Sequence, residues 1–337
     1  MSDEQTDLKH TDMTNQSQPA SKTVQGVAAR LLFLAACMAG VAAQPAFAQA
    51  LNTSLNEQVV MVPKKTGLFS IELETTVYKP DGDGPFPIVV INHGKAFGDS
   101  RFQARSRPGS AARYFMSRGY VVVVPMRRGF SKSTGSYIGG GCNVESNGLS
   151  QAEDVKDVLD YMTAQPYADK NQILIAGQSH GGWTTLAFGT MNYPGVQGLV
   201  NFAGGLRQES CAGWESTLAR AAGSYGENTR LPSLWFYGDN DSYFSVTTHS
   251  DMFKRYTAAG TPARLVSFGV FGNDAHSMFG SQDGLRIWQP EMTAFLKQVG
   301  LPHQVSPAFA KYQSASASTA SADVAPISTN PNAAPPN

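Results

Sequence analysis

The sequence predicts an α/β domain with a mostly parallel central sheet, helices on both faces and an antiparallel N-terminal edge. The first reason is a series of apolar runs without a polar face, at residues 87–91, 120–124, 173–176, 196–202 and 234–237. Strands of this composition are buried on both sides, as in parallel sheets covered by helices. The second reason is that helical segments separate these runs. Strand–helix alternation is typical of doubly wound sheets, which bind ligands at the carboxyl ends of their strands.

The other expected elements follow from their own periodicities. Residues 70–78 alternate between apolar and polar side chains, which predicts a half-exposed strand at the antiparallel edge. A further strand is expected at 263–268. Helical segments are expected at 111–118, 149–163, 245–259 and 285–299. In the second of these, apolar residues recur three and four positions apart, as on the buried face of a helix.

The overall composition is that of an ordinary globular protein. The chain has 337 residues, of which 42% are hydrophobic and 15% are charged. Lys plus Arg and Asp plus Glu both number 26, so the formal net charge is zero. Nucleic-acid-binding proteins normally carry a basic excess, and we therefore expect no nucleic-acid partner.

The first 48 residues predict a signal peptide with a long polar leader. The apolar run 31–43 is shorter than the roughly 20 residues that span a bilayer, so no stable membrane span is expected. Ala46-Phe47-Ala48 places small residues where signal peptidase reads them, which predicts cleavage before Gln49. Anchoring as a lipoprotein at Cys37 is the second-ranked alternative. We expect an exported protein, periplasmic or secreted.

Residues 49–302 are expected to form one domain, followed by a disordered tail rich in Ala, Ser and Pro at 303–337. Segments 135–148 and 205–228 are candidates for a small cap over the pocket. They contain Cys142 and Cys211, which we expect to form a disulfide in an oxidising compartment. The alternative is a pair of separate buried thiols.

The segment Gly177-Gln178-Ser179-His180-Gly181 carries the strongest functional signal. It follows an apolar strand and precedes a helix, which is the setting that a G-x-S-x-G nucleophile turn requires. The serine of such a turn has a strained backbone, and flanking glycines remove the side chains that would collide. We therefore predict Ser179 as the nucleophile. The backbone N–H of His180, at the helix start, is the expected first oxyanion donor.

A serine hydroxyl needs a positioned base, and in this arrangement an acid and a histidine follow the serine along the chain. His276 lies in a loop just after strand 263–268 and is the predicted base, whereas His249 falls in a helical segment. Asp239 and Asp241 both follow strand 234–237 and compete for the acid; we favour Asp241. Asp274 is too near His276 in sequence and is expected to shape the loop.

The loop after strand 87–91 is expected to supply the second oxyanion donor. It begins His93-Gly94-Lys95, and the glycine allows the backbone to approach the site. We predict the Lys95 N–H as the donor and a structural role for His93.

Taken together, these residues resemble the α/β-hydrolase superfamily over about residues 70–299, most of all its dienelactone-hydrolase-like and exported serine esterase-peptidase branches. The matching features are His93-Gly94, Arg128-Gly129-Phe130-Ser131, the Ser179 turn, Gly238-x-x-Asp241 and His276. In this superfamily the acid takes the last position of the G-x-x-D turn, which implies Asp241. Dienelactone hydrolases proper use a cysteine nucleophile, so their substrate is not implied.

Two further pairs have alternative interpretations. Arg127 and Arg128 follow strand 120–124 and either bind a substrate carboxylate or form a structural ion pair with an acid such as Glu153 or Asp154. We favour the ion pair. Trp183 and Trp214 either line the pocket or pack in the core.

The sequence therefore predicts an exported serine hydrolase that cleaves a carboxylic ester through an acyl-enzyme. It contains no Cys/His cluster at zinc spacing and no phosphate-binding loop, so we expect no metal and no cofactor. The expected partner is a small-molecule ester or peptide. The alternatives are a serine peptidase or amidase acting on small peptides, a polymer- or lipid-active esterase, and a non-catalytic binding protein with the same fold.

Overall fold

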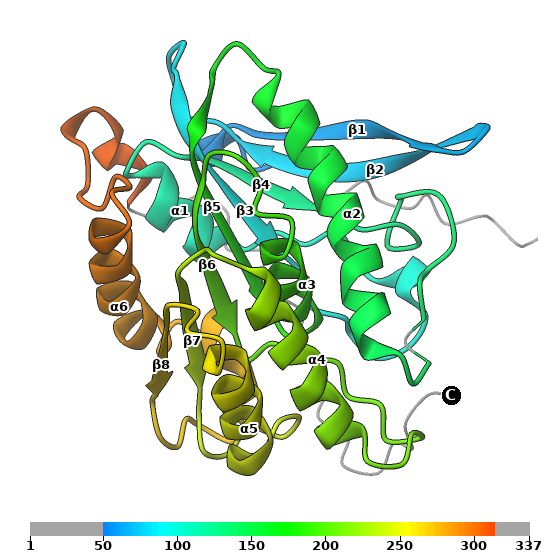
Figure 1. Ribbon diagram of the computed structural model, residues 1–337. Helices are drawn as coiled ribbons and strands as arrows, with labels where there is room; N and C mark the ends of the chain where they lie inside the picture. The colour runs from blue at the N-terminus through cyan, green and yellow to red at the C-terminus, as the bar shows by residue number, and fades with distance from the viewer. Residues whose placement is uncertain (1–49, 140, 314–337) are drawn as a thin grey trace, which may run out of the picture. The chain divides into compact units, whose positions relative to one another are not determined.

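The computed structural model describes residues 50–139 and 141–313. Within them, a mixed sheet has the order β1-β2-β4-β3-β5-β6-β7-β8 (Figure 1). The strands are β1 (Glu57–Thr66), β2 (Phe69–Tyr78), β3 (Phe86–Asn92), β4 (Val121–Pro125), β5 (Ala168–Gln178), β6 (Val196–Phe202), β7 (Ser233–Tyr237) and β8 (Ala263–Ser267). Strands β3 to β8 are all parallel to one another. Each of the predicted apolar strands is present.

Helices cover both faces of the sheet. One face carries α2 (Val144–Thr163), α3 (His180–Gly189), α4 (Trp214–Asn228) and α5 (Val246–Thr257), and the other carries α1 (Gly109–Met116) and α6 (Leu285–Gln298) (Figure 1). Strand residues alternate between the two cores: Ile88 and Val90 face one, and Val89 and Ile91 face the other. This confirms the predicted fold class, a mostly parallel sheet between two layers of helices.

The antiparallel edge consists of two strands, of which only the second was expected. β1 pairs with β2 along its whole length, from Glu57 opposite Tyr78 to Thr66 opposite Phe69. β2 in turn pairs antiparallel with β4. The last six residues of β2 are buried, four of them opposite β4, and only its first four residues keep the predicted half-exposed character.

Segment 205–228, one of the two candidate cap segments, consists mostly of α4. The Leu218, Ala222 and Tyr225 side chains of this helix are buried in the core. α4 packs closely against α5, since a Cβ at Gly226 would collide with the backbone of Tyr256. A cap formed by segments 135–148 and 205–228 stays a prediction.

The C-terminal boundary also differs from the prediction. The short helix η4 (Pro307–Tyr312) lies beyond residue 302, so the folded part extends past the predicted start of the tail. Tyr312 is buried, and its hydroxyl accepts hydrogen bonds from the Asn56 side chain and the Asp81 backbone, both at 3.0 Å. The predicted signal peptide, Cys37 and the rest of the tail lie outside the described residues. Within the described ranges, no helix is both long and apolar enough to cross a membrane.

Candidate active site

Ser179 occupies a sharp turn between β5 and α3. Its backbone angles, φ 56° and ψ −125°, lie in a region that residues with a Cβ rarely adopt. The glycines on either side allow the turn. A Cβ at Gly177 would lie 2.6 Å from the Thr185 hydroxyl, and one at Gly181 would lie 2.6 Å from the His93 carbonyl oxygen. The turn leaves Ser179 partly exposed, while residues 173–177 of the strand before it are buried.

His276 and Asp241 come together at the carboxyl end of the sheet. His276 lies in the short helix η3 (Ala275–Gly280) after β8, and Asp241 follows β7. The His276 Nδ1 lies 3.0 Å from Asp241 Oδ2 and 3.2 Å from Oδ1, and both residues are buried. The Asp241 Oδ1 also accepts the backbone N–H groups of Tyr243 and Phe244, at 2.8 and 3.0 Å. These bonds fix the carboxylate, which can in turn orient the imidazole.

The competing candidates lie elsewhere. The Asp239 carboxylate is exposed, and its backbone N–H bonds to the Gly269 carbonyl. The Asp274 side chain accepts the backbone N–H groups of His276 and Ser242, so it shapes the loop as expected. His249 is buried in α5 with its ring stacked on Tyr237. Of the acids considered, Asp241 is the one that contacts the His276 ring.

Gln178 joins the serine turn to the histidine loop, a role that sequence reasoning missed. Its Nε2 donates a hydrogen bond to the backbone carbonyl of His276 at 3.1 Å. No hydrogen bond is recorded between the Ser179 hydroxyl and the His276 ring in the described chain. In free enzymes such bonds are often long and tighten only when substrate binds. The position just before the serine in the motif is the only sequence signal that could have drawn attention to Gln178.

The start of α3 and the loop after β3 lie next to Ser179. His180 is the first residue of α3, and its Nε2 lies 2.9 Å from Asn147 Oδ1. A Cβ at Gly94 would lie 3.1 Å from the Ser179 Cβ, so the loop after β3 passes close to Ser179. The next residue is Lys95. Its Nζ donates to the Ala96 and Gly98 carbonyls, and its N–H makes no recorded hydrogen bond in the described chain.

Basic side chains lie buried behind this loop. The Arg127 guanidinium is fully buried and donates to the His93 carbonyl at 2.8 Å and to Gln151 Oε1 at 2.7 Å. Burial lowers the pKa of Arg127 to about 10. Burial first, and the Arg127 charge second, hold the pKa values of His93 and His180 well below the usual range of histidine. Both imidazoles are therefore neutral at pH 7, and Arg127 fixes the loop through the His93 carbonyl.

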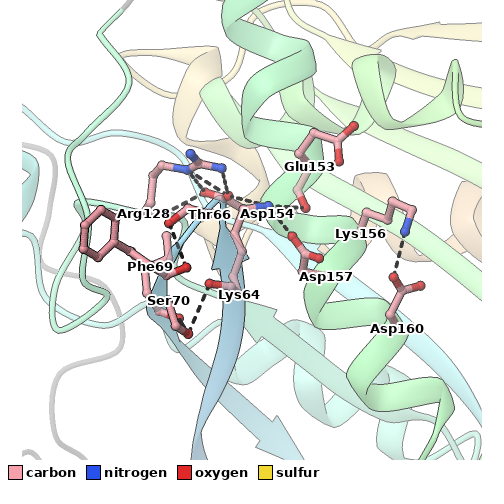
Figure 2. Close-up of polar contacts among 11 residues, drawn as sticks. Lys64, Thr66, Phe69, Ser70, Arg128, Glu153, Asp154, Lys156, Asp157 and Asp160 are labelled. Carbon is pink, nitrogen blue, oxygen red and sulfur yellow. Dashed lines mark hydrogen bonds and ion pairs between the residues drawn. The ribbon is translucent and has the colours of Figure 1, made fainter.

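Arg128 forms the structural ion pair that we favoured. Its guanidinium and its backbone N–H both bond to the buried Asp154 carboxylate of α2, with Nε to Oδ1 at 2.9 Å (Figure 2). Lys64 of β1 also reaches this carboxylate, at 3.4 Å, and pairs with Asp157 one helical turn further on. Figure 2 shows Asp154 between these two cations. The cluster ties the antiparallel edge and the loop after β4 to α2.

The predicted disulfide is confirmed. Cys142 and Cys211 are bonded, with an S–S distance of 1.98 Å, and join the loop before α2 to the loop before α4. Trp183 packs in the core, where its Nε1 donates to the Val144 carbonyl, and Trp214 is half-buried at the start of α4. In residues 50–139 and 141–313, no group of three or more His, Cys, Asp or Glu side chains is placed to hold a metal ion.

Comparisons with known proteins agree with this architecture. A family model described as X-Pro dipeptidyl-peptidase (S15 family) matches residues 69–226. No curated protein matches the chain.

Solved structures give broader coverage. An esterase of Pyrococcus furiosus is 15% identical with a TM-score of 0.54, over 74% of this chain and 93% of that one. A putative dienelactone hydrolase of Klebsiella pneumoniae is 18% identical with a TM-score of 0.52, over 72% and 98%. A puromycin-hydrolyzing peptidase of Mycobacterium tuberculosis is 18% identical with a TM-score of 0.55, over 75% of this chain and 41% of that one. The sheet order and these similarities show that the chain shares the fold of the esterase and of the putative dienelactone hydrolase.

Proposed function

We propose that this protein is a serine hydrolase that cleaves a carboxylic ester through an acyl-enzyme. The observation that carries the proposal is the strained Ser179 turn tied by Gln178 to a histidine that is bonded to a buried aspartate. Ser179 is the proposed nucleophile, His276 the base and Asp241 the residue that orients the base. These are the roles that acyl transfer requires, each on a separate loop at the carboxyl edge of the sheet.

In the first half of the reaction, Ser179 Oγ attacks the carbonyl carbon of the ester while His276 Nε2 takes the hydroxyl proton. The negative charge that develops on the carbonyl oxygen is stabilised by the backbone N–H groups of His180 and Lys95. Asp241 stabilises the imidazolium that forms. The C–O bond then breaks, His276 returns the proton to the departing alcohol, and the acyl group remains on Ser179.

In the second half, water replaces the alcohol. His276 removes a proton from the water as it attacks the acyl carbon, and the proton then passes to Ser179 Oγ as the acid leaves. The products are an alcohol and a carboxylic acid, and no external electron carrier takes part. Arg127 supports both halves indirectly, because it holds the carbonyl of His93 two residues before the Lys95 donor.

A serine peptidase or amidase acting on small peptides is the second candidate. It is favoured by the match to the X-Pro dipeptidyl-peptidase model and by the likeness to a peptidase of Mycobacterium tuberculosis. This chain, however, covers only 41% of that peptidase, whereas it covers 93% and 98% of the esterase and the putative dienelactone hydrolase. A polymer- or lipid-active esterase remains a third candidate for the same residues.

Labelling and substrate panels test the proposal. We expect a fluorophosphonate probe to label the full chain at Ser179 and to leave Ser179→Ala unlabelled. We expect the enzyme to hydrolyse nitrophenyl acyl esters faster than aminoacyl nitroanilides. Faster cleavage of nitroanilides would favour the peptidase. If the wild-type protein is not labelled, the remaining candidate is a non-catalytic binding protein with this fold.

Export is part of the proposal. The Cys142–Cys211 disulfide supports it, because disulfides persist in oxidising compartments. Fractionation of cells that express the full chain, followed by N-terminal sequencing, tests it. We expect a periplasmic or secreted form that begins at Gln49, whereas a lipid-modified Cys37 would indicate an anchored lipoprotein.

A further inference from the structure

A row of aromatic rings leads outward from the proposed catalytic histidine. The Tyr243 ring stacks on the His276 imidazole, with centroids 4.3 Å apart and planes 28° apart. The Phe97 ring lies next in the row, 6.3 Å from Tyr243 and tilted by 36°. Tyr243 comes from the loop after β7, and Phe97 from the loop after β3. Two loops that are 146 positions apart in sequence therefore bring aromatic faces together at the carboxyl edge of the sheet.

The inner ring is held in place before any ligand binds. The Arg207 guanidinium lies 5.7 Å from the centroid of Tyr243, and its Nη1 donates to the Ser242 carbonyl at 2.9 Å. Glu209 pairs with the same guanidinium. The backbone N–H of Tyr243 is bonded to Asp241. A ring fixed by these contacts loses little conformational freedom when a second ring packs against it.

The outer ring is left in solvent. The Phe97 side chain is 54% exposed, although it contacts another aromatic residue beside the proposed chemistry. Ligand sites are lined mainly by apolar and aromatic side chains with a few fixed polar groups, and this pairing has that character. Leu68, which is 99% exposed in the turn between β1 and β2, offers a contrast because this turn belongs to the antiparallel edge and not to the loops that carry the proposed site.

We propose that Phe97 and Tyr243 form a subsite for a flat aromatic ring carried by the substrate, close to its scissile carbonyl. This inference rests on the proposed function, because it takes His276 as the base. The base must stand beside the reacting group, so a substituent that packs on Tyr243 is only a few bonds from the carbonyl. Aromatic pairs gain energy beyond their buried area in offset or tilted geometries, so a planar ring is favoured over a saturated ring of similar size.

Matched esters test the ring directly. Benzyl acetate and cyclohexylmethyl acetate place the ring on the alcohol side, and methyl phenylacetate and methyl cyclohexylacetate place it on the acyl side. Hydrolysis is followed by acid release, because chromogenic leaving groups are themselves aromatic. We expect kcat/KM to favour the aromatic member by about fivefold in one of the two series, which also identifies the side of the ester that enters the subsite.

Variants identify the residues responsible. In Phe97→Leu, which keeps apolar bulk without a ring, we expect the selectivity ratio to fall to about one. Leu68→Ala is the control and is expected to keep the wild-type ratio. A wild-type ratio near one in both series, or a ratio that Phe97→Leu leaves unchanged, would overturn the subsite.

The subsite and the proposed function can fail separately. If the wild-type protein hydrolyses the esters without selectivity, the function stands and the subsite is wrong. If it hydrolyses none of them, calorimetry of benzyl alcohol and phenylacetate binding to Ser179→Ala decides about the subsite. If either compound binds, and adding Phe97→Leu weakens that binding by about fivefold, the subsite is supported without the chemistry. If neither compound binds, the subsite is rejected.

Discussion

Replacement of Gly181 by alanine tests whether the serine turn needs a residue without a side chain. The new Cβ would lie 2.6 Å from the His93 carbonyl oxygen and closer still to the carbonyl of Asn92. Both are backbone atoms at the end of β3, which is buried and paired on both sides by β4 and β5. No side-chain rotation relieves the clash. The start of α3 and the end of β3 therefore have to separate by about 1 Å.

This displacement predicts two effects of different size. Forcing an extra carbon into a packed interior typically costs 1–3 kcal/mol, and a clash between backbones belongs at the upper end, so we expect a loss of about 3 kcal/mol of unfolding free energy. For a domain of this size that corresponds to a fall of about 6–12 °C in Tm. The Ser179 hydroxyl moves with α3 relative to the loop that carries Lys95. A misplacement of about 1 Å lowers kcat by about 100-fold.

The assay combines thermal unfolding with ester hydrolysis on the same preparation. Gly139→Ala is the matched control, because a Cβ there meets no atom within 4 Å and its φ is not in the left-handed region. We expect the control to stay within about 1 kcal/mol of wild type. If Gly181→Ala kept wild-type kcat and Tm, the argument that packing at this turn places the nucleophile would be wrong.

The remaining predictions concern the acid, the disulfide and the buried ion pair. Asp241→Asn keeps the size of the side chain but cannot stabilise an imidazolium at His276, so kcat for ester hydrolysis should fall by about 10⁴-fold while circular dichroism is unchanged; a fall below tenfold contradicts the assignment. The double variant Cys142→Ser with Cys211→Ser should lose about 2–4 kcal/mol in urea unfolding, and reductant should destabilise wild type but not the variant. Asp154→Asn should lower the free energy of unfolding by about 3 kcal/mol in the same urea assay, because it leaves buried cations without their carboxylate. An unchanged unfolding midpoint would contradict a stabilising role of this ion pair.

The sequence-based prediction of the fold succeeded where burial alone determines residue choice. Strands β3, β4 and β7, most of β6 and residues 173–177 of β5 are buried, so their sequences are largely apolar and differ clearly from exposed segments. β1 was missed because Pro63, Lys64 and Lys65 interrupt its apolar pattern. These residue types are tolerated at an edge, where one side of the strand has no ladder partner. The residue composition of this edge strand is thus more like that of a loop than like that of the central strands.

The serine turn is the part of the candidate site that one short segment predicts. The glycines around Ser179 are required locally, so the turn could be read from five residues. The bond from Gln178 to the His276 carbonyl joins residues 98 positions apart and leaves no sequence pattern. Asp241 was favoured over Asp239, two positions earlier, through the resemblance to the G-x-x-D turn, whereas the distance from its carboxylate to the His276 ring comes from the structure alone.

The distribution of these contacts separates chemistry from selectivity in this fold. Ser179 and His276 are placed by backbone constraints, namely the packing of Gly177 and Gly181 against neighbouring backbone or side chains and the Gln178 bond to a carbonyl. Phe97, in contrast, is held by few contacts in a long, exposed loop. Substitutions at Phe97 therefore change a surface that the core does not depend on, whereas substitutions at the glycines disturb core and chemistry together. Changes of substrate preference at constant stability should accordingly arise in the loop after β3, and much less readily at the turn that carries Ser179.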